Sequence, residues 1–304
     1  MCEVGCFALF CLFLAKLFFM RWQGREQSTR VEDRRGGRRG RVIGGGIGLG
    51  TIVIALLYTF LTGEPPTDVL QQQMPPVQQA PASPASKRDD DALADFAKVV
   101  FKDNEDVWSD IFRKQLHRNY RFPTLVLYDG YTQAACGMAQ SAMGPFYCPA
   151  DEKIYLDLSF YRDLRNKFGA SGDFAMAYVI AHEVGHHVQK LLGITDRVER
   201  MRRRMSKRDF NRLSVRLELQ ADFLAGVWAR HIQQMKHVLD EGDIEEAVRA
   251  AAAVGDDRIQ KRSMGYVVPD AFTHGTSEQR VRWFLKGYRT GDLRQGDTFN
   301  AREL

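Results

Sequence analysis

The chain has 304 residues, of which 44% are hydrophobic and 27% are charged, a composition that supports a packed core and excludes a wholly disordered chain. The net charge is +5, but residues 1–42 hold nine basic and four acidic residues, whereas the remaining 262 residues hold 34 of each. The positive charge is therefore local, and it gives no support for a nucleic-acid partner.

The first 42 residues divide into an apolar stretch and a basic stretch. Residues 7–19 read FALFCLFLAKLFF, a run that Lys16 interrupts and that is too short to cross a bilayer comfortably. Residues 1–19 are therefore a doubtful extension: a signal-like region, a re-entrant hairpin, or sequence upstream of a translation start at Met20. Residues 20–42 form a basic segment, with eight basic and three acidic residues between Arg21 and Val42.

Residues 43–61 read IGGGIGLGTIVIALLYTFL and contain no charged residue. As a helix with a rise of about 1.5 Å per residue, this segment nearly matches a bilayer core of about 30 Å. Because the basic flank precedes it, we expect a single transmembrane helix with residues 20–42 in the cytoplasm and the body outside. A buried core helix is the alternative, but the polar flanks argue against it. The glycines of this segment also resemble a dinucleotide-binding loop, but no strand precedes them, so we discard that match.

The rest of the chain reads as a linker followed by one folded domain. Residues 62–90 are rich in Pro, Gln, Ala and Ser, which is typical of a flexible tether. Residues 91–304 form the predicted domain, whose apolar periodicity indicates a first helix from about Asp89 to Leu116. Strands are expected at 124–130 and 153–160, and the pattern is mainly helical from Asp173 onwards. The fold class expected is α+β, mainly helical with a small sheet.

An apolar helix predicted over residues 173–192 carries the sequence HEVGH, from His182 to His186. Histidines four positions apart lie on one helical face, so both imidazoles can reach one metal ion. Glu183 lies beside them and can take a proton from a zinc-activated water. The alternative, a buried helix with incidental histidines, would bury Glu183 at high cost. We therefore predict Zn²⁺ on His182 and His186, with Glu183 as the general base.

A catalytic zinc site needs a third protein ligand. The sequence HVQKLLGIT follows His186 and lacks the third histidine of the extended HExxHxxGxxH motif. The apolar stretch RLELQADFLAGVWARH instead carries Glu218 and Asp222, one helical turn apart. We expect Glu218 to bind the metal and Asp222 to accept a hydrogen bond from the outer nitrogen of a ligand histidine. A solvated acidic face is the alternative, and His231 and His237 are the other available ligands.

Taken together, HEVGHHVQ, ELQAD with AGVWA, FTHGTSEQR and GDTF resemble the family called putative neutral zinc metallopeptidases, over residues 20–299. These are membrane-anchored bacterial proteins with a gluzincin-type site. The resemblance implies a zincin-like domain on the periplasmic side of the inner membrane, and it favours Met20 as the first residue. It also implies a zinc site made of His182, His186 and Glu218, with Glu183 catalytic.

The two cysteines in the body of the chain are Cys136 and Cys148. By composition and spacing they could close a small disulfide loop in an oxidising compartment or remain free thiols. The resemblance implies the disulfide. Family members commonly carry two further cysteines at the positions of Phe223 and Gly296; this chain lacks both, as expected if those cysteines normally bond to each other.

The segment THGTSEQR, residues 273–280, resembles a T-H-P-x-x-x-x-R segment of membrane zinc peptidases of the gluzincin kind. The resemblance implies that His274 approaches the substrate carbonyl, where a hydrogen-bond donor would stabilise an oxyanion. We expect Arg280 to brace an acidic group nearby. The alternative is that Thr276 and Ser277 cap a helix while His274 is merely exposed.

The sequence thus predicts a membrane-anchored zinc endopeptidase that acts on protein or peptide substrates. The stretch IYLDL, residues 154–158, is a candidate strand edge for binding a substrate backbone in extended form. The alternative is a catalytically silent, zinc-stabilised and membrane-tethered interaction protein. The presence of Glu183 argues against it, because a purely structural metal site needs no base.

Overall fold

The structure is a computed structural model that describes residues 20–36, 84–140, 144–170 and 172–304. Within these ranges, no helix combines the length and the apolar character that a membrane crossing requires. The predicted transmembrane helix at 43–61, the extension 1–19 and most of the linker lie outside the described residues. The described part is mainly helical with a small sheet, which confirms the predicted α+β class.

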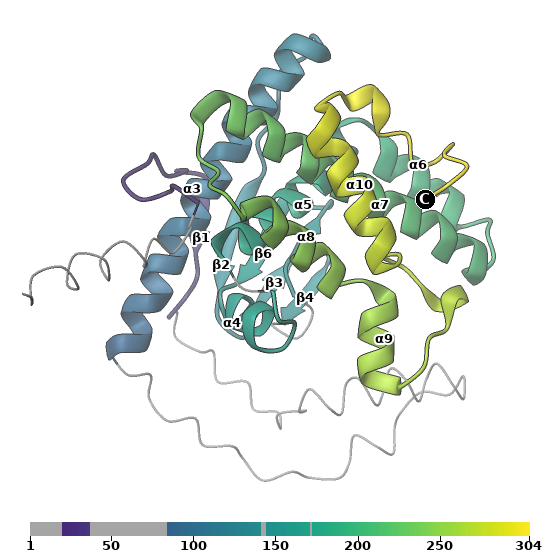
Figure 1. The fold of residues 1–304 in the computed structure, drawn as a ribbon, viewed down its shortest axis with the longest axis horizontal. Helices are drawn as coiled ribbons and strands as arrows, with labels where there is room; N and C mark the ends of the chain where they lie inside the picture. The colour runs from purple at the N-terminus through teal and green to yellow at the C-terminus, as the bar shows by residue number, and fades with distance from the viewer. Residues whose placement is uncertain (1–19, 37–83, 141–143, 171) are drawn as a thin grey trace, which may run out of the picture.

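Three helices carry most of the core. Helix α3 spans Pro84–Gln115, α5 spans Asp173–Leu191 and α7 spans Lys207–Lys236. All three lie where the apolar periodicity predicted helices, although α3 begins before the Asp triplet that was expected to mark its start. The shorter elements are α4 (Ser159–Asn166), α6 (Ile194–Arg202), α8 (Asp243–Ala253), α9 (Asp256–Met264), α10 (Ser277–Thr290), η2 (Pro269–Ala271) and η3 (Leu293–Gln295) (Figure 1).

Helix α10 packs along α7 at very short range. A Cβ atom on Gly226 would lie 2.0 Å from the carbonyl oxygen of Phe284, and one on Gly287 would lie 2.0 Å from that of Phe223. Only glycine permits such an approach of the two backbones. This contact holds the segment before α10, with His274, against the middle of α7.

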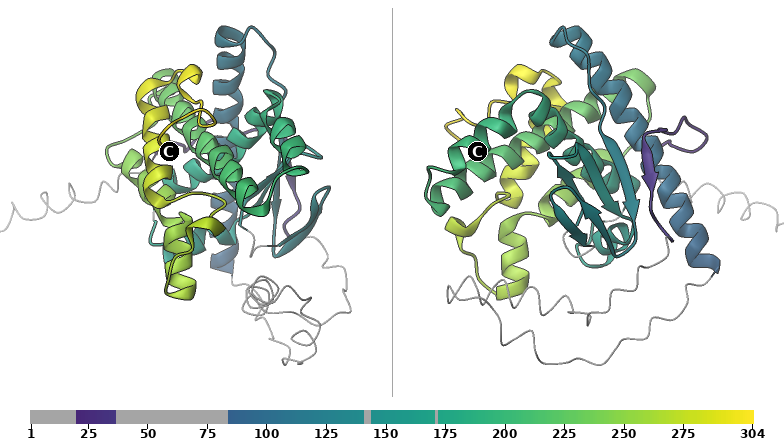
Figure 2. Two further views of the ribbon diagram at one scale, coloured as in Figure 1. Left: turned by 90° about the vertical axis from the view of Figure 1, so that its right-hand side faces the viewer. Right: turned by 180° about the vertical axis from the view of Figure 1, so that it is seen from behind.

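The main sheet has the strand order β1-β2-β6-β5 and lies beside α3, as the rear view shows (Figure 2). Strands β2 (Thr124–Tyr128) and β6 (Lys153–Asp157) confirm the two predicted strands and pair in parallel, with Leu125 opposite Ile154. The IYLDL stretch is interior, because β5 (Phe146–Cys148) pairs antiparallel with β6. The expectation that IYLDL offers a free edge is therefore wrong, and the edge beside it is β5.

Both faces of this sheet are covered, which explains why its central strands are apolar without alternation. Leu125 and Ile154 pack with the helices, whereas Val126 and Tyr155 pack under a hairpin. The hairpin consists of β3 (Tyr131–Ala134) and β4 (Gly137–Gln140), which the sequence analysis did not predict.

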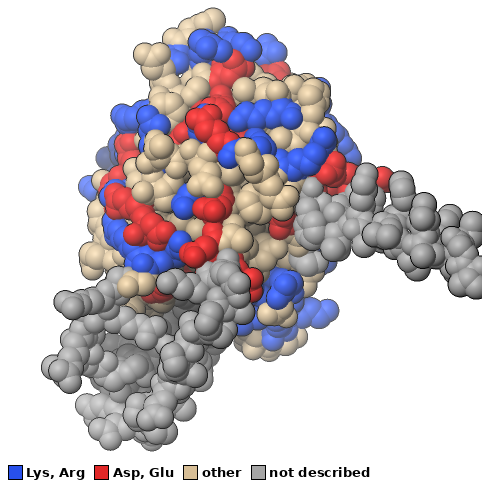
Figure 3. Space-filling view, turned by 90° about the vertical axis from the view of Figure 1, so that its left-hand side faces the viewer, with Lys and Arg blue, Asp and Glu red and all other residues tan. Residues whose placement is uncertain are grey.

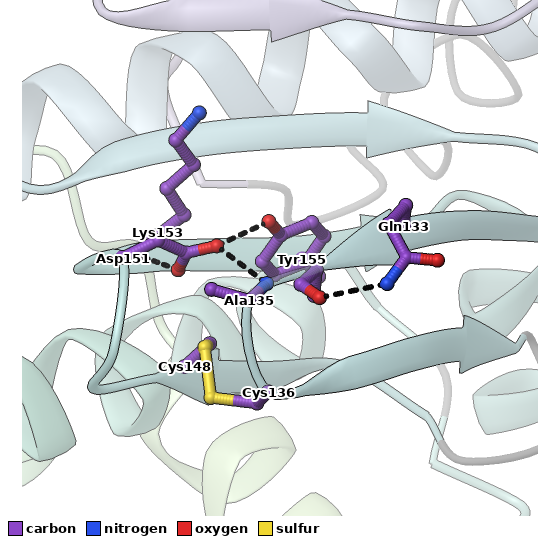
Figure 4. The surroundings of a disulfide bond; sticks show 8 residues. Gln133, Ala135, Cys136, Cys148, Asp151, Lys153 and Tyr155 are labelled. Atoms are coloured by element: carbon purple, nitrogen blue, oxygen red, sulfur yellow. Dashed lines mark hydrogen bonds between the residues drawn. A yellow bond between two sulfur atoms is a disulfide. The ribbon is translucent and has the colours of Figure 1, made fainter.

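A disulfide fixes this hairpin to the edge strand (Figure 4). Cys136 lies in the hairpin turn and Cys148 ends β5, and their sulfur atoms are bonded, as predicted. Next to the bond, Asp151 accepts hydrogen bonds from the backbone N–H of Ala135 at 3.1 Å and from the hydroxyl of Tyr155 at 2.7 Å. The hairpin is thus attached to the sheet by one covalent bond and by polar contacts.

Residues 20–36 belong to the same folded unit as the body. Strand β1 (Val31–Asp33) pairs in parallel with β2, with Val31 opposite Leu125. Met20 is only 2% exposed, and the Trp22 ring packs edge-on against Phe96 at 5.5 Å between centroids. This corrects the predicted boundary between a separate basic segment at 20–42 and a domain starting at 91. The basic character misled the prediction, because charges such as that of Arg25 pair with acids of the body.

The face formed by α3 carries both signs of charge side by side (Figure 3). Lys236 lies 2.9 Å from Asp103 and 2.6 Å from Asp106, and Lys102 contacts Asp106 at 2.6 Å. The sequence of the body carries equal numbers of basic and acidic residues, and on this face the two kinds also lie next to each other.

Candidate metal centre

The candidate centre forms where α5 crosses α7. A Cβ atom on Gly185 would lie 3.1 Å from the carbonyl oxygen of Ala221, so the glycine of HEVGH is the point of closest approach. His182 lies three residues before Gly185 and His186 one residue after it, and both face the turn of α7 that carries Glu218. The crossing therefore explains why these two distant motifs meet.

Three side chains converge as the sequence predicted. Oε2 of Glu218 lies 3.2 Å from Nε2 of His182 and 3.5 Å from Nε2 of His186, and all three ligand atoms lie within 4.8 Å of one another. Tetrahedral zinc with bonds of about 2.0–2.2 Å separates its ligand atoms by about 3.3–3.6 Å. Among the residues described, this is the one His, Cys, Asp or Glu group with this spacing. The residues fit a zinc ion.

The outer nitrogen of His182 is held by a buried charged network. Its Nδ1 lies 2.9 Å from Oδ1 of Asp222, which is 0% exposed. Arg280 donates to both carboxylate oxygens of Asp222, at 2.9 and 3.0 Å, and the hydroxyl of Tyr178 donates to Oδ1 at 2.5 Å. Burial opposes ionisation, but Arg280 and His182 lower the pKa of Asp222 to about 2. A carboxylate at Nδ1 leaves Nε2 as the free ligand atom.

The outer nitrogen of His186 is held by an amide. Its Nδ1 lies 2.9 Å from Oε1 of Gln189, whose Nε2 donates to the carbonyl of Leu217 at 2.7 Å and to Gln220 at 3.1 Å. Gln220 in turn donates to the carbonyl of Gly296 at 2.9 Å. This chain of neutral groups orients His186 toward Glu218 without a charged partner.

Glu183 lies beside the two histidines and is 8% exposed. Burial raises the pKa of its carboxyl, although the charges of His186 and His182 and the backbone N–H of Tyr147, in β5, act in the opposite direction. A carboxylate with a raised pKa next to a metal site is suited to accept a proton.

His274 lies on the loop before α10, and its side chain is 51% exposed. Asp256, at the start of α9, accepts hydrogen bonds from the backbone N–H groups of Thr273, His274 and Gly275 at 2.6–3.0 Å, and its Oδ1 lies 3.3 Å from Nδ1 of His274. Burial alone would lower the pKa of His274, but Glu218 and Asp256 together raise it. Thr276 caps α10 with a full capping box. The structure thus contains both the cap and an imidazole that interacts electrostatically with Glu218.

The remaining histidines lie away from the centre. Nε2 of His231 contacts the carbonyl of Gly291 at 3.0 Å, and His237 ends α7 in a left-handed conformation. His187 is fully buried on the other side of α5, between Tyr147 and the carbonyl of Arg121. The structure does not bring these alternative ligands to the candidate site.

Sequence reasoning missed Tyr178 and Asp256 and left Gln189 without an assigned role. Tyr178 precedes His182 by one helical turn and Gln189 follows His186 by three residues, so helical spacing was a usable signal for both. Asp256 carried no such signal, because it reaches His274 only through the fold.

The two positions where the family resemblance implied further cysteines are in contact. Phe223 is 0% exposed, and a Cβ atom on Gly296 would lie 2.5 Å from its ring. In this chain the ring of Phe223 therefore fills the space beside Gly296, where a side chain would not fit without a shift. The pair lies behind Gln220, on the His186 side of the centre.

Comparison with known proteins matches these observations. The chain is 49% identical over 287 residues to "Uncharacterized protein YpfJ" of Escherichia coli K12, covering 92% of this chain and 99% of the relative. It is 43% identical over 205 residues to "Uncharacterized protein Rv2575" of Mycobacterium tuberculosis H37Rv, covering 64% of this chain and 68% of the relative. No solved structure matches significantly. A family model described as "Putative neutral zinc metallopeptidase" matches residues 20–299, and the chain therefore belongs to that family.

Proposed function

We propose that the chain is a zinc-dependent endopeptidase that hydrolyses peptide bonds with Glu183 as the general base. The observation that carries this proposal is the convergence of His182, His186 and Glu218, with both histidine outer nitrogens held by acceptors. A zinc ion bound there would polarise a carbonyl and lower the pKa of water toward about 7. The fold is accordingly proposed to be zincin-like.

The side chains around the centre have separate proposed roles in the reaction. Glu183 takes a proton from the attacking water and passes it to the leaving amine. His274, held by Asp256, donates a hydrogen bond to the oxyanion that develops on the carbonyl. Asp222 and Arg280 keep His182 oriented through both steps.

The substrate class proposed is an extended segment of protein. Strand β5 is the sheet edge nearest the site, and the backbone N–H of its Tyr147 faces Glu183. An extended peptide that adds to this edge by main-chain hydrogen bonds would run past the base. Main-chain pairing supports binding without specifying a sequence.

The location proposed is the bacterial inner membrane, with the catalytic body on the extracytoplasmic side. The disulfide between Cys136 and Cys148 supports it, because such bonds persist in oxidising compartments. Residues 43–61, which lie outside the described residues, are the proposed membrane attachment; because residues 20–36 pair with the body, this attachment would leave both parts on the same side of the membrane and would not be a single crossing.

The substitution Glu183→Gln tests the activity. It keeps the size of the side chain and removes the base, so the variant should bind zinc as the wild type does and lose cleavage of casein by at least about 100-fold. A comparison of extracytoplasmic peptides from the two strains would then identify natural substrates.

Two outcomes would contradict the proposed activity. Wild-type protein that holds zinc and cleaves neither casein nor any extracytoplasmic protein would favour the catalytically silent interaction protein. Equal cleavage by Glu183→Gln and wild type would remove Glu183 from the mechanism.

A further inference from the structure

The first described residues contact the body at the start of α5 and at the loop that precedes α8. Met20 is 2% exposed, and the backbone N–H of Arg21 donates to the carbonyl of Val238 at 2.9 Å. The indole N–H of Trp22 donates to Asp173, the first residue of α5, at 3.1 Å. Residues 20–22 therefore lie by the first residue of α5 and the loop that leads into α8, where Arg21 also interacts electrostatically with Asp243.

Three carboxylates gather around this point. Asp173 begins α5, Asp243 begins α8, and Glu246 accepts a hydrogen bond from the backbone N–H of Phe174 at 3.1 Å. Asp243 is 0% exposed, and its Oδ1 has no hydrogen-bond partner. Among the residues described, none of the three acids has a lysine or arginine nitrogen within 4.0 Å. The cluster therefore has a buried acceptor and, among the residues described, no cation in direct contact, although Arg21 and Arg249 act on Asp243 and Glu246 from a greater distance.

The three acids do not form a compact metal site. Within the described part of the chain, the group at His182, His186 and Glu218 is the one whose ligand atoms are close enough together for a metal ion. An ammonium group requires less compact geometry than a metal ion, because it donates three hydrogen bonds and its acceptors need not surround it. The missing cation is therefore better supplied by a primary ammonium group.

The chain can supply such a group at Met20. The family match begins at this residue, and the Escherichia coli relative aligns over 99% of its own length while it covers 92% of this chain. The family match places the beginning of the shared sequence at Met20, and the coverage of the relative is compatible with that start. A chain that starts there carries a free α-amino group, which is mostly protonated at neutral pH because its ordinary pKa is about 8.

We propose that the polypeptide starts at Met20 and that its α-ammonium group binds in the acid cluster of Asp173, Asp243 and Glu246. In that chain the ammonium is the partner of the buried Oδ1 of Asp243. It also fixes the first strand, because residues 20–22 lead into the segment that ends in β1.

The electrostatics of the cluster support this assignment. Burial raises the pKa of Asp243 to about 6 and that of Glu246 to about 7, and the neighbouring acids add to both shifts, while backbone N–H groups and the charges of Arg21 and Arg249 oppose them. A buried acid without a cation is costly in its ionised form. An ammonium group in the cluster offsets that cost.

Two measurements test the proposal on the whole protein. Intact mass of the protein made from its own gene, with the upstream region in place, should give a chain that starts at Met20 with an unmodified amine. The Tm of that chain should exceed, by about 4 °C or more, that of a chain in which Met-Ser-Gly-Ser precedes Met20. The Asp243→Asn variant should remove this difference, whereas Glu241→Gln, an exposed neighbour, should keep it.

Amine labelling at pH 6.5 gives a readout that a merely structural role of Asp243 would not change. The α-amine of the folded Met20 chain should react about tenfold more slowly than that of Asp243→Asn. A mature chain that starts at Met1 would overturn the proposal. Equal Tm values with and without the extension, or equal labelling of wild type and Asp243→Asn, would overturn the binding site.

Discussion

The two sides of the candidate metal centre hold their histidines in different ways. On one side, Asp222, Arg280 and Tyr178 form a fully buried charged network around the outer nitrogen of His182. On the other side, the amide of Gln189 meets the outer nitrogen of His186, whose side chain is 16% exposed. Ionised acceptors bind more strongly than neutral ones, and a buried charge cannot lose its partner without a large cost. The His182 side is thus the stronger support.

Glu218 is common to both sides, so its loss should have the largest effect. Glu218→Ala removes one of the three proposed metal ligands, and we expect zinc affinity to fall by more than about 100-fold, beyond the range typical of outer partners. Metal content after dialysis and competition with a chelator would measure it. His231→Ala is the matched control and should keep full zinc. Retention by Glu218→Ala together with loss in His231→Ala would refute the ligand set.

The charged side should give the next largest effect. Asp222→Ala frees the outer nitrogen of His182 and leaves Arg280 buried without its partner. We expect zinc affinity to fall by about 10–100-fold and unfolding free energy by about 3–5 kcal/mol. Adding Arg280→Met should recover part of the stability without the affinity, as denaturant and chelator titrations would show. If the double variant is less stable than Asp222→Ala, the buried charge is not the cause.

The neutral side should tolerate change better. Gln189→Leu removes an uncharged acceptor from His186, and we expect zinc affinity to fall by less than about tenfold. It should also lower the unfolding free energy by about 1–2 kcal/mol, because the Leu217 carbonyl loses its donor. Gln234→Leu, at an exposed position of α7, serves as the control. A loss as large as that of Asp222→Ala would abolish the distinction between the two sides.

The smallest effect on the metal should come from the packing behind the His186 side. Replacing Phe223 and Gly296 together by cysteine removes the ring that a Cβ atom at 296 would meet. We expect the two cysteines to form a disulfide in air and zinc affinity to stay within about twofold. Thiol counting on the unfolded, unreduced protein measures the bond. Two additional free thiols would show that these backbones are too far apart for it.

The helices and the candidate ligands followed from the sequence because both were read from local periodicity, and the structure brings these candidates together. His182, Glu183 and His186 share one helix, and Glu218 with Asp222 repeats the same spacing on another. The Cys136–Cys148 bond required the family resemblance, since spacing alone left free thiols open. Strand β1 and the β3–β4 hairpin were missed, because short pairs depend on partners far along the chain. Asp256 was missed for the same reason.

The pairing of β1 with β2 has a consequence for the route of the chain through a membrane. Residues 20–36 and 84–304 share one sheet, so they must face the same compartment. The chain between them can then cross a bilayer an even number of times or not at all. One crossing by residues 43–61, with residues 20–42 left behind in the cytoplasm, is incompatible with this sheet. A thiol-reactive probe that cannot pass the membrane should react equally with cysteines placed at the exposed positions Thr29 and Thr290.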